Sequence, residues 1–333
     1  MEPGNRMSWP KKATACVLLL VACLVAAGPA GAQGGRDRIF RLAVLGQSAL
    51  SLQLTRETTL PELERLGFVR GRTLDVADAF GDSVSLPGLA RELVAGKPDV
   101  LIAVGGEAVR AAAAATDQIP IVGFGPDPVQ LGLARTLSRP GRNVTGIVIL
   151  AAELEGKRLH LLSEAVPGMS RVGLLLYPRS TSAETSLREA RDVGGRIGIE
   201  VLPINVEKAG DIGPALAGLK SAGAGAVVVS ADPRLFNDTP TVVAEAARLG
   251  LPLACQWVEM AEAGCLLSYG PGLRQQRVRL ADYVVRLFRG AQPADMPVEQ
   301  PTTFELAINL KTARALGLQI PPTVLSRAEQ IIE

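Results

Sequence analysis

Short apolar runs alternate with helical segments along most of this chain, and the alternation is the strongest constraint on its fold. Strands separated by helices of this length are joined by crossovers, which makes neighbouring strands parallel. We therefore expect an α/β fold. The expected strands are residues 40–45, 73–80, 100–104, 121–124, 171–177, 199–204, 226–230, 251–255, 264–269 and 303–309.

The pattern forms two α/β units of similar layout, followed by a tail with a long helix at 274–288. A length of 333 residues is typical of about two domains, and 47% hydrophobic residues can form two cores. The net charge is +2 and no basic block occurs, so nothing favours a nucleic-acid partner. The long helix suggests that the chain crosses back between the two units.

The first 32 residues have the layout of a signal peptide. Lys11 and Lys12 precede an apolar run at 13–27, and Ala30-Gly31-Ala32 matches a cleavage site for export. The run is short for a membrane-spanning helix. We favour cleavage after Ala32 and a periplasmic protein, with lipidation of Cys23 in the string LVAC as the alternative.

Two cysteines remain after the signal peptide, Cys255 and Cys265. Export permits a disulfide between them. The alternative is that both are small buried residues at strand ends. We favour the unpaired alternative, because the pair would have to meet across two different elements.

The chemistry of most hydrolases and metal sites is hard to build from this sequence. Its one histidine, His160, lies within an amphipathic helical pattern. No Walker A motif, G-x-G-x-x-G string or G-x-S-x-G elbow occurs. We expect no enzyme activity, no cofactor and no metal.

Small residues and neutral hydrogen-bonding groups recur where the expected strands end. Ligands bind at the carboxyl ends of strands in open α/β sheets. Each such residue, Asp127 included, is alternatively a common turn former or helix cap. The candidate ligand-binding residues are Gln47, Ser48, Gly105, Gly106, Gly125, Asp127, Thr145, Tyr177, Ser230, Asp232, Gln256 and Tyr269.

Several long strings resemble the substrate-binding proteins of ABC importers, and more narrowly the TrpX/TrpY-like family. The resemblance covers residues 41–333. The strings are DPVQLGL at 127–133, RPGRNVTG at 139–146, EGKRLHLL at 155–162, AGCLLSYGP at 263–271, PVEQPTTFEL at 297–306, INLKTARALG at 308–317 and IPP at 320–322.

The resemblance implies a type I periplasmic-binding-protein fold, with two doubly wound parallel-sheet lobes joined by three crossover segments. It places the hinges near 143–146, 268–270 and 300–303. The N-terminal lobe would comprise residues 36–143 and about 271–298, and the C-terminal lobe residues 147–268 and about 303–333. Such lobes close on a ligand by hinge motion.

The family implies capture of a small organic solute, an amino acid or a related and possibly aromatic compound, for delivery to a membrane permease. We expect a monomer. Two departures leave the ligand open: FGPD at 124–127 is a tight turn, and Tyr177-Pro178 stands where Asn-Pro is frequent. An aromatic pocket would use Tyr177, Trp257 or Tyr269.

Three alternatives use the same α/β units. A periplasmic sensor subunit would pass a ligand signal to a membrane kinase. An exported enzyme would need a nucleophile and base that the sequence does not supply. A ligand-responsive transcription regulator would need a helix-turn-helix in place of the signal peptide.

Overall fold

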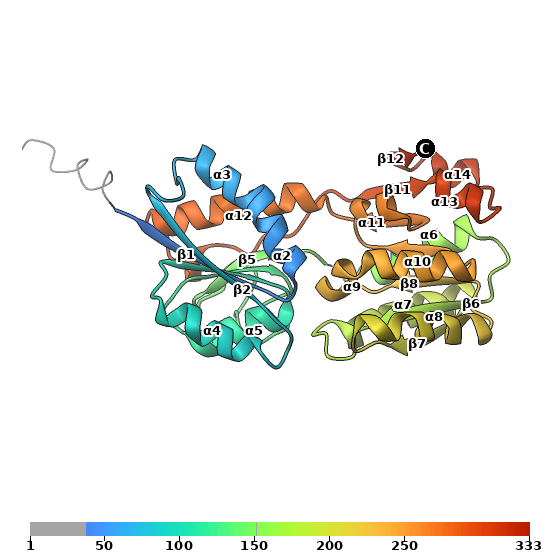
Figure 1. The fold of residues 1–333 in the computed structure, drawn as a ribbon, viewed down its shortest axis with the longest axis horizontal. Helices are drawn as coiled ribbons and strands as arrows, with labels where there is room; N and C mark the ends of the chain where they lie inside the picture. Colours follow the sequence, from blue (N-terminus) through green and yellow to red (C-terminus); the bar gives the residue numbers. More distant parts are fainter. Residues whose placement is uncertain (1–37, 151) are drawn as a thin grey trace, which may run out of the picture. The chain divides into compact units, whose positions relative to one another are not determined.

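The computed structural model describes residues 38–150 and 152–333. The predicted signal peptide and Cys23 lie outside these residues. Residues Phe40–Glu333 form one compact unit that contains a five-stranded and a seven-stranded sheet (Figure 1). The expected α/β architecture with two parallel-sheet lobes is confirmed.

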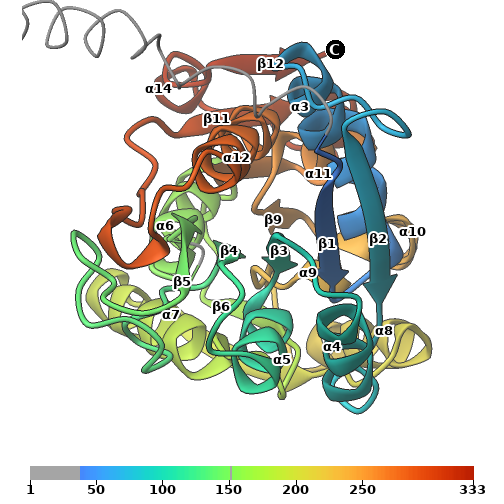
Figure 2. The ribbon, with the colours of Figure 1, turned by 90° about the vertical axis from the view of Figure 1, so that its left-hand side faces the viewer.

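The first sheet is wholly parallel, with strand order β2-β1-β3-β4-β5. Its inner strands are nearly continuous apolar runs because helices cover both faces, whereas the edge strand β2 carries two aspartates and is mostly exposed or half-buried. In β1, Leu42 and Val44 pack with residues of α12 (Leu273–Phe288), and Ala43 and Leu45 pack with residues of α4 (Leu86–Ala95) and α5 (Gly106–Ala115). Figure 2 shows α12 on one side of the sheet and α4 and α5 on the other. The strands are β1 (Phe40–Gly46), β2 (Leu74–Phe80), β3 (Val100–Val104), β4 (Ile121–Gly125) and β5 (Val144–Val148).

Helical structure on this sheet begins earlier than the sequence indicated. In the sequence, the apolar positions Leu60, Leu63 and Leu66 followed by Gly67 predict a helix at 60–67. In the structure α2 (Ala49–Leu54), a π-helical turn η1 (Thr55–Thr59) and α3 (Leu60–Arg65) follow one another without a break. Ser48 caps α2 by accepting a hydrogen bond from the Ser51 amide. The other helices on this sheet are α4 (Leu86–Ala95), α5 (Gly106–Ala115) and the long α12 (Leu273–Phe288).

The second sheet has the order β12-β11-β10-β9-β8-β6-β7, and β10 and β11 are its antiparallel pair. Neighbouring residues of β6 again face opposite ways: Leu174 packs with α6 and α7, and Leu175 with α8 and α10. The strands are β6 (Arg171–Leu176), β7 (Glu200–Asn205), β8 (Ala226–Val229), β9 (Leu253–Cys255), β10 (Leu267–Gly270), β11 (Glu305–Asn309) and β12 (Gln330–Ile332).

The helical segments between the strands of the second sheet are α6 (Glu155–Ala165), α7 (Ala183–Ile197), η2 (Ala209–Asp211), α8 (Ile212–Ser221), α9 (Pro233–Asn237), α10 (Thr239–Leu249), α11 (Val258–Ala263), α13 (Leu310–Ala315) and α14 (Pro322–Leu325). The 3-10 turn η3 (Pro293–Asp295) follows α12 and contacts β5 of the first sheet.

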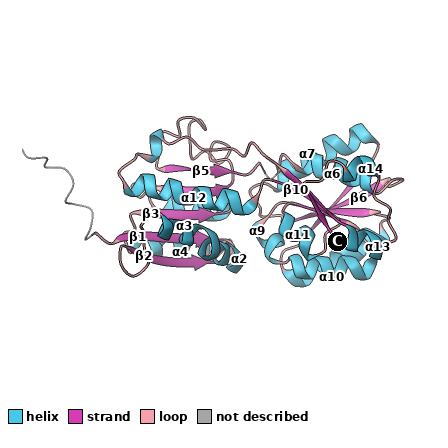
Figure 3. Ribbon diagram, turned by 90° about the horizontal axis from the view of Figure 1, so that it is seen from above, coloured by secondary structure: helices cyan, strands magenta, loops and turns pink. Residues whose placement is uncertain are grey.

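The chain passes between the two sheets three times. It leaves the first sheet after β5, leaves the second after β10 to form α12 on the first sheet (Figure 3), and returns to form β11. Val144–Val148 pairs with β4 along its whole length, so these residues belong to the first sheet. The lobe boundaries and the three hinges stay predictions.

The preference for unpaired cysteines was wrong, because a disulfide joins Cys255 and Cys265. Both are fully buried. The two elements that seemed too distant are neighbours: β9 and β10 pair in parallel, and only the six-residue helix α11 separates them. The chain therefore returns to the same place within ten residues.

The close approach of β4 and β5 depends on Gly146. Gly146 pairs with Gly123, has φ of 136°, and a Cβ on it would lie 2.0 Å from the Gly123 carbonyl oxygen. We expect Gly146→Ala to lower the free energy of unfolding by roughly 3 kcal/mol or more in urea titrations, because backbone strain and a steric clash add together.

Gly67→Ala is the matched control. Gly67 also has positive φ, 96°, but no atom lies within 4 Å of a Cβ built there. It should lose only about 1 kcal/mol. Equal losses in the two variants would contradict the close approach.

Candidate functional site

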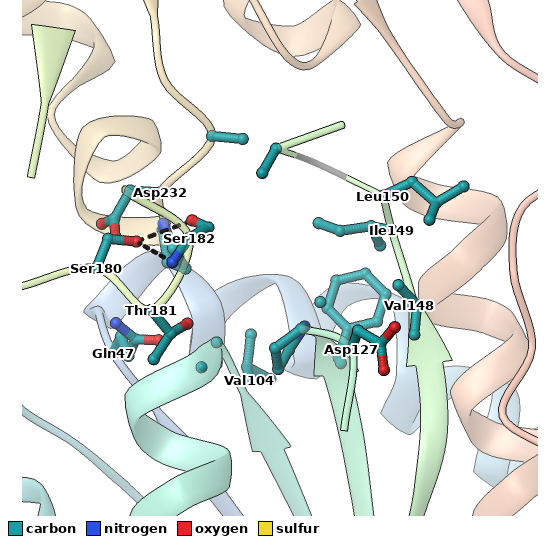
Figure 4. A pocket seen from close by; sticks show the side chains of 18 of the residues that line it. Gln47, Val104, Asp127, Val148, Ile149, Leu150, Ser180, Thr181, Ser182 and Asp232 are labelled. Atoms are coloured by element: carbon teal, nitrogen blue, oxygen red, sulfur yellow. Dashed lines mark hydrogen bonds between the residues drawn. The ribbon is translucent and has the colours of Figure 1, made fainter. Parts of the chain in front are cut away.

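A cavity of about 260 Å³ lies where the carboxyl ends of strands from both sheets meet (Figure 4). The first sheet contributes residues after β1, β3, β4 and β5, and the second contributes residues after β6, β8 and β9. Ligands of open α/β sheets bind at this end of the strands. The volume is just below the roughly 300–1,000 Å³ of typical small-molecule sites, which favours a small solute.

Seven of the twelve candidate ligand-binding residues line this cavity. In Figure 4, Asp127 lies on one side with Val148 and Ile149, and Asp232 lies on the other with Ser180 and Ser182. Their contact with a ligand stays a prediction. The seven are Gln47, Gly105, Gly106, Gly125, Asp127, Asp232 and Gln256.

The other five are not among the cavity-lining residues, although they also lie at or near strand ends. Ser48 caps α2, and the Thr145 hydroxyl donates to the Met296 carbonyl at 2.8 Å. Tyr177 donates its hydroxyl to the Glu207 carbonyl, and the Tyr269 ring stacks on Phe304. Ser230 is buried at the end of β8. Strand-end residues can point to either face of a sheet, and spacing alone does not distinguish the two.

The turn between β3 and α5 is glycine-rich because other side chains fill the space beside it. Gly105 has φ of 93°, and a Cβ there would lie 1.9 Å from Gln47 Oε1. A Cβ on Gly106 would lie 1.9 Å from Thr181 Oγ1, which belongs to the loop after β6. Loops from the two sheets therefore touch at this turn.

An ion-pair cluster also joins the two sheets. Arg234, in α9, binds Asp232 through Nε at 2.9 Å and Nη2 at 3.0 Å. Its Nη1 lies 3.1 Å from Oε2 of Glu107 in α5, and its guanidinium lies over the Tyr177 ring. Burial raises the pKa of Glu107, and the charge of Arg234 opposes that rise. The negative charge of Asp232 is balanced by Arg234, to which it is hydrogen-bonded.

Asp127 has the local role that its sequence also allowed. Its Oδ1 accepts hydrogen bonds from the amides of Val129 at 2.7 Å and Gln130 at 3.3 Å, which fixes the turn after β4. Asp127 also lines the cavity, so a turn-forming role does not conflict with the predicted ligand contact.

Arg277 is a cavity residue that the sequence analysis missed. It lies in α12 with 3% of its surface exposed. Residues 273, 277, 280 and 284 follow the i, i+4, i+7, i+11 spacing of one helix face, and the other three are apolar. A positive charge on this otherwise apolar helix face could have pointed to Arg277. The helix contains several other arginines, so the charge did not stand out in the sequence.

The loops of the second sheet rest on a buried ion pair. Glu155 and Arg158 have fully buried side chains and lie 2.9 Å apart. Glu155 Oε1 accepts the amide of Ala231 at 2.8 Å, and Arg158 Nε donates to the Tyr269 carbonyl at 2.9 Å. Because Ala231 lines the cavity, this pair positions its wall.

The family of the chain follows from its match to the model for ABC transporter substrate binding proteins, over residues 50–332. The chain belongs to this family. These are binding proteins and not enzymes, so the expected family and the expected lack of catalysis are confirmed.

Individual relatives support the assignment. A tyrosine-binding protein of Clostridioides difficile is 23% identical over 273 residues, which cover 81% of this chain and 78% of the relative. A conserved domain protein from Vibrio cholerae has a TM-score of 0.82 and 26% identity. An ABC domain from Streptococcus pneumoniae, solved with L-Trp, has a TM-score of 0.80 and 26% identity. Both structural alignments cover 88% of this chain and 100% of the other.

Within residues 38–150 and 152–333, no helix is long and apolar enough to cross a membrane. The same residues contain no group of three or more His, Cys, Asp or Glu side chains arranged to hold a metal ion.

Breaking the buried pair beneath the cavity wall should destabilise the fold. We expect Glu155→Gln to reduce the free energy of unfolding by about 3 kcal/mol, because it removes the charge of one partner from a fully buried ion pair. Urea titration measures the change. Glu200→Gln is the control, since Glu200 pairs with Arg171 at an exposed site and should cost under about 1 kcal/mol. A Glu155→Gln variant as stable as this control would contradict the assigned role.

Proposed function

We propose that this chain is the exported solute-binding component of an ABC importer, and that it captures an amino acid or related small organic solute in the cavity. The observation that carries the proposal is the cavity itself, which is lined by strand ends of both sheets. The predicted signal peptide supports export to the periplasm. A membrane permease would receive the solute, and the protein would act as a monomer.

An aromatic solute is the favoured class. One relative is a tyrosine-binding protein and one similar structure holds L-Trp. The cavity of this chain is lined by Phe124, Phe236 and Trp257, which can pack against an aromatic ring. Of the three aromatic residues expected from the sequence, Trp257 is the one that lines the cavity, whereas Tyr177 and Tyr269 do not.

Capture would proceed by hinge closure. A ligand shifts the equilibrium between an open and a closed form only if it binds one of them more tightly. A cavity between two lobes meets this condition, because both lobes contact the ligand only in the closed form. Contacts between loops of the two sheets, Glu107 with Arg234 and Gly106 with Thr181, would then belong to the closed form.

A thermal-shift screen of residues 33–333 tests the proposed function. The protein is first unfolded in urea and refolded, so that no co-purified solute remains. L-Trp, L-Tyr, L-Phe, other amino acids, aromatic acids and sugars are then compared. A ligand at 100 times its Kd adds about 2.7 kcal/mol of stability, and the melting temperature should rise by several degrees. If none of these solutes raises it, the proposal fails.

Closure predicts that Glu107 contributes to affinity without lining the cavity. We expect Glu107→Gln to weaken solute binding by about fivefold to tenfold in calorimetric titrations, because about 1 to 1.4 kcal/mol of closed-form ion pairing is lost. Glu200→Gln, whose ion pair lies within one sheet, should leave the Kd unchanged. An unchanged Kd in Glu107→Gln would contradict closure through this contact.

A further inference from the structure

Arg277 is a buried cation whose bonding capacity is only partly used. Its Nη1 donates to the Ser51 carbonyl and to Thr55 Oγ1, both at 3.2 Å. Its Nε is buried and has no hydrogen-bond partner among residues 38–150 and 152–333. A guanidinium has five N–H donors in a planar fork, so one nitrogen serves the protein and the rest of the fork remains available.

The structural role of Arg277 does not account for its charge. The carbonyl and hydroxyl that bind Nη1 join α12 to the helical stretch α2–η1, and a neutral donor would serve them equally well. Burial lowers the pKa of Arg277 to about 10, so the side chain is still charged at neutral pH. A charge without a counter-charge in a buried site is costly. Its retention therefore calls for a partner that the described chain does not supply.

The acidic groups lining the cavity are committed to other partners. Asp232 is paired with Arg234, and the Oδ1 of Asp127 fixes its own turn. Glu153 is exposed and accepts a hydrogen bond from Gln130. Outside the cavity lining, the field of Glu259 reaches Arg277, but no ion pair within 4.0 Å joins them.

The surroundings of Arg277 suit a planar anion with an apolar body. Its guanidinium carbon lies 5.1 Å from the centre of the Phe124 ring, and both residues line the cavity. The free edge of an arginine fork binds a carboxylate through two parallel hydrogen bonds. The apolar part of such a molecule would pack against the ring beside it.

We propose that Arg277 binds the carboxylate of the captured solute, which restricts the ligand class to small organic carboxylates, zwitterionic amino acids included. This inference rests on the proposed function and names the charge that the site recognises. Neutral molecules of the same shape would leave the buried cation unpaired and would be rejected.

Acid and amide pairs test the inference, because the primary amide keeps the shape of the carboxylate and removes its charge. L-Trp is compared with L-tryptophanamide, L-Tyr with L-tyrosinamide, L-Leu with L-leucinamide, and benzoate with benzamide, by calorimetric titration of refolded residues 33–333. Wild-type protein should bind the acid of a recognised pair at least about 30-fold more tightly than the amide. In Arg277→Gln this ratio should fall towards one.

The ratio within one variant separates recognition from general damage, since a loosened α12 would weaken acid and amide alike. Thr55→Val is the matched control: it removes one acceptor of Nη1 and keeps the guanidinium, so the ratio should persist. If Arg277→Gln does not fold, Arg277→Lys replaces it. This variant keeps the positive charge but loses the planar fork, so the acid-to-amide ratio should be smaller than in wild type. The wild-type ratio itself requires no variant.

The outcomes distinguish the two proposals. Binding of acids with the same ratio in wild type and Arg277→Gln overturns the role of Arg277 and leaves the proposed function standing. If wild-type protein binds the amides as tightly as the acids, the role of Arg277 is likewise overturned and the proposed function still stands. Failure of every acid, amide and sugar to bind overturns the proposed function, and the role of Arg277 with it.

Discussion

Helix α12 couples the two sheets, and the rest of the structure depends on how it is held. The chain leaves the second sheet after β10, forms α12 on the first sheet and re-enters the second as β11, antiparallel to β10. The Thr59 hydroxyl donates to the Arg277 carbonyl, and the buried Tyr283 donates its hydroxyl to the Pro297 carbonyl. These bonds fix α12 on the first sheet and hold the segment that leads back. Two sheets tied in this way keep their strand ends facing one cavity.

The charges around the cavity explain what the site can recognise. The protein pairs most of its buried charges internally, Asp232 with Arg234 and Glu155 with Arg158. Arg277 is the exception among the cavity-lining cations that are buried, because both of its hydrogen bonds go to neutral oxygens. In a site complementary to an anionic solute, the other buried charges are paired within the protein, and one cation remains to pair with the ligand.

Much of the fold could be predicted from the sequence because buried parallel strands are continuous apolar runs, and turns follow them at regular intervals. The helical stretch α2–η1 was missed because Thr55 and Thr59 are buried against α12, so its inner face is polar in the sequence. The length of β5 and its pairing with β4 could not be predicted, because a segment with small residues such as Thr145 and Gly146 carries a weak strand signal. The disulfide depends on β9 and β10 being neighbours, which is a property of the sheet order.

The site was predictable to the level of strand ends and not to the level of side-chain direction. Gln47, Asp127 and Gln256 line the cavity, whereas Thr145 and Tyr269, equally close to strand ends or crossovers, do not. Arg277 comes from the returning helix, more than 200 residues after Ser51, whose carbonyl it binds. Only the path of the chain brings such residues together.

A crystal structure of the refolded protein with the tightest-binding carboxylate of the screen would show which side chain holds the anionic group. We predict a solute in the cavity between the two sheets, with its carboxylate oxygens within hydrogen-bond distance of the Arg277 guanidinium and its apolar part against Phe124. A solute bound elsewhere, or in the cavity with Arg277 still lacking an anionic partner, would contradict this prediction.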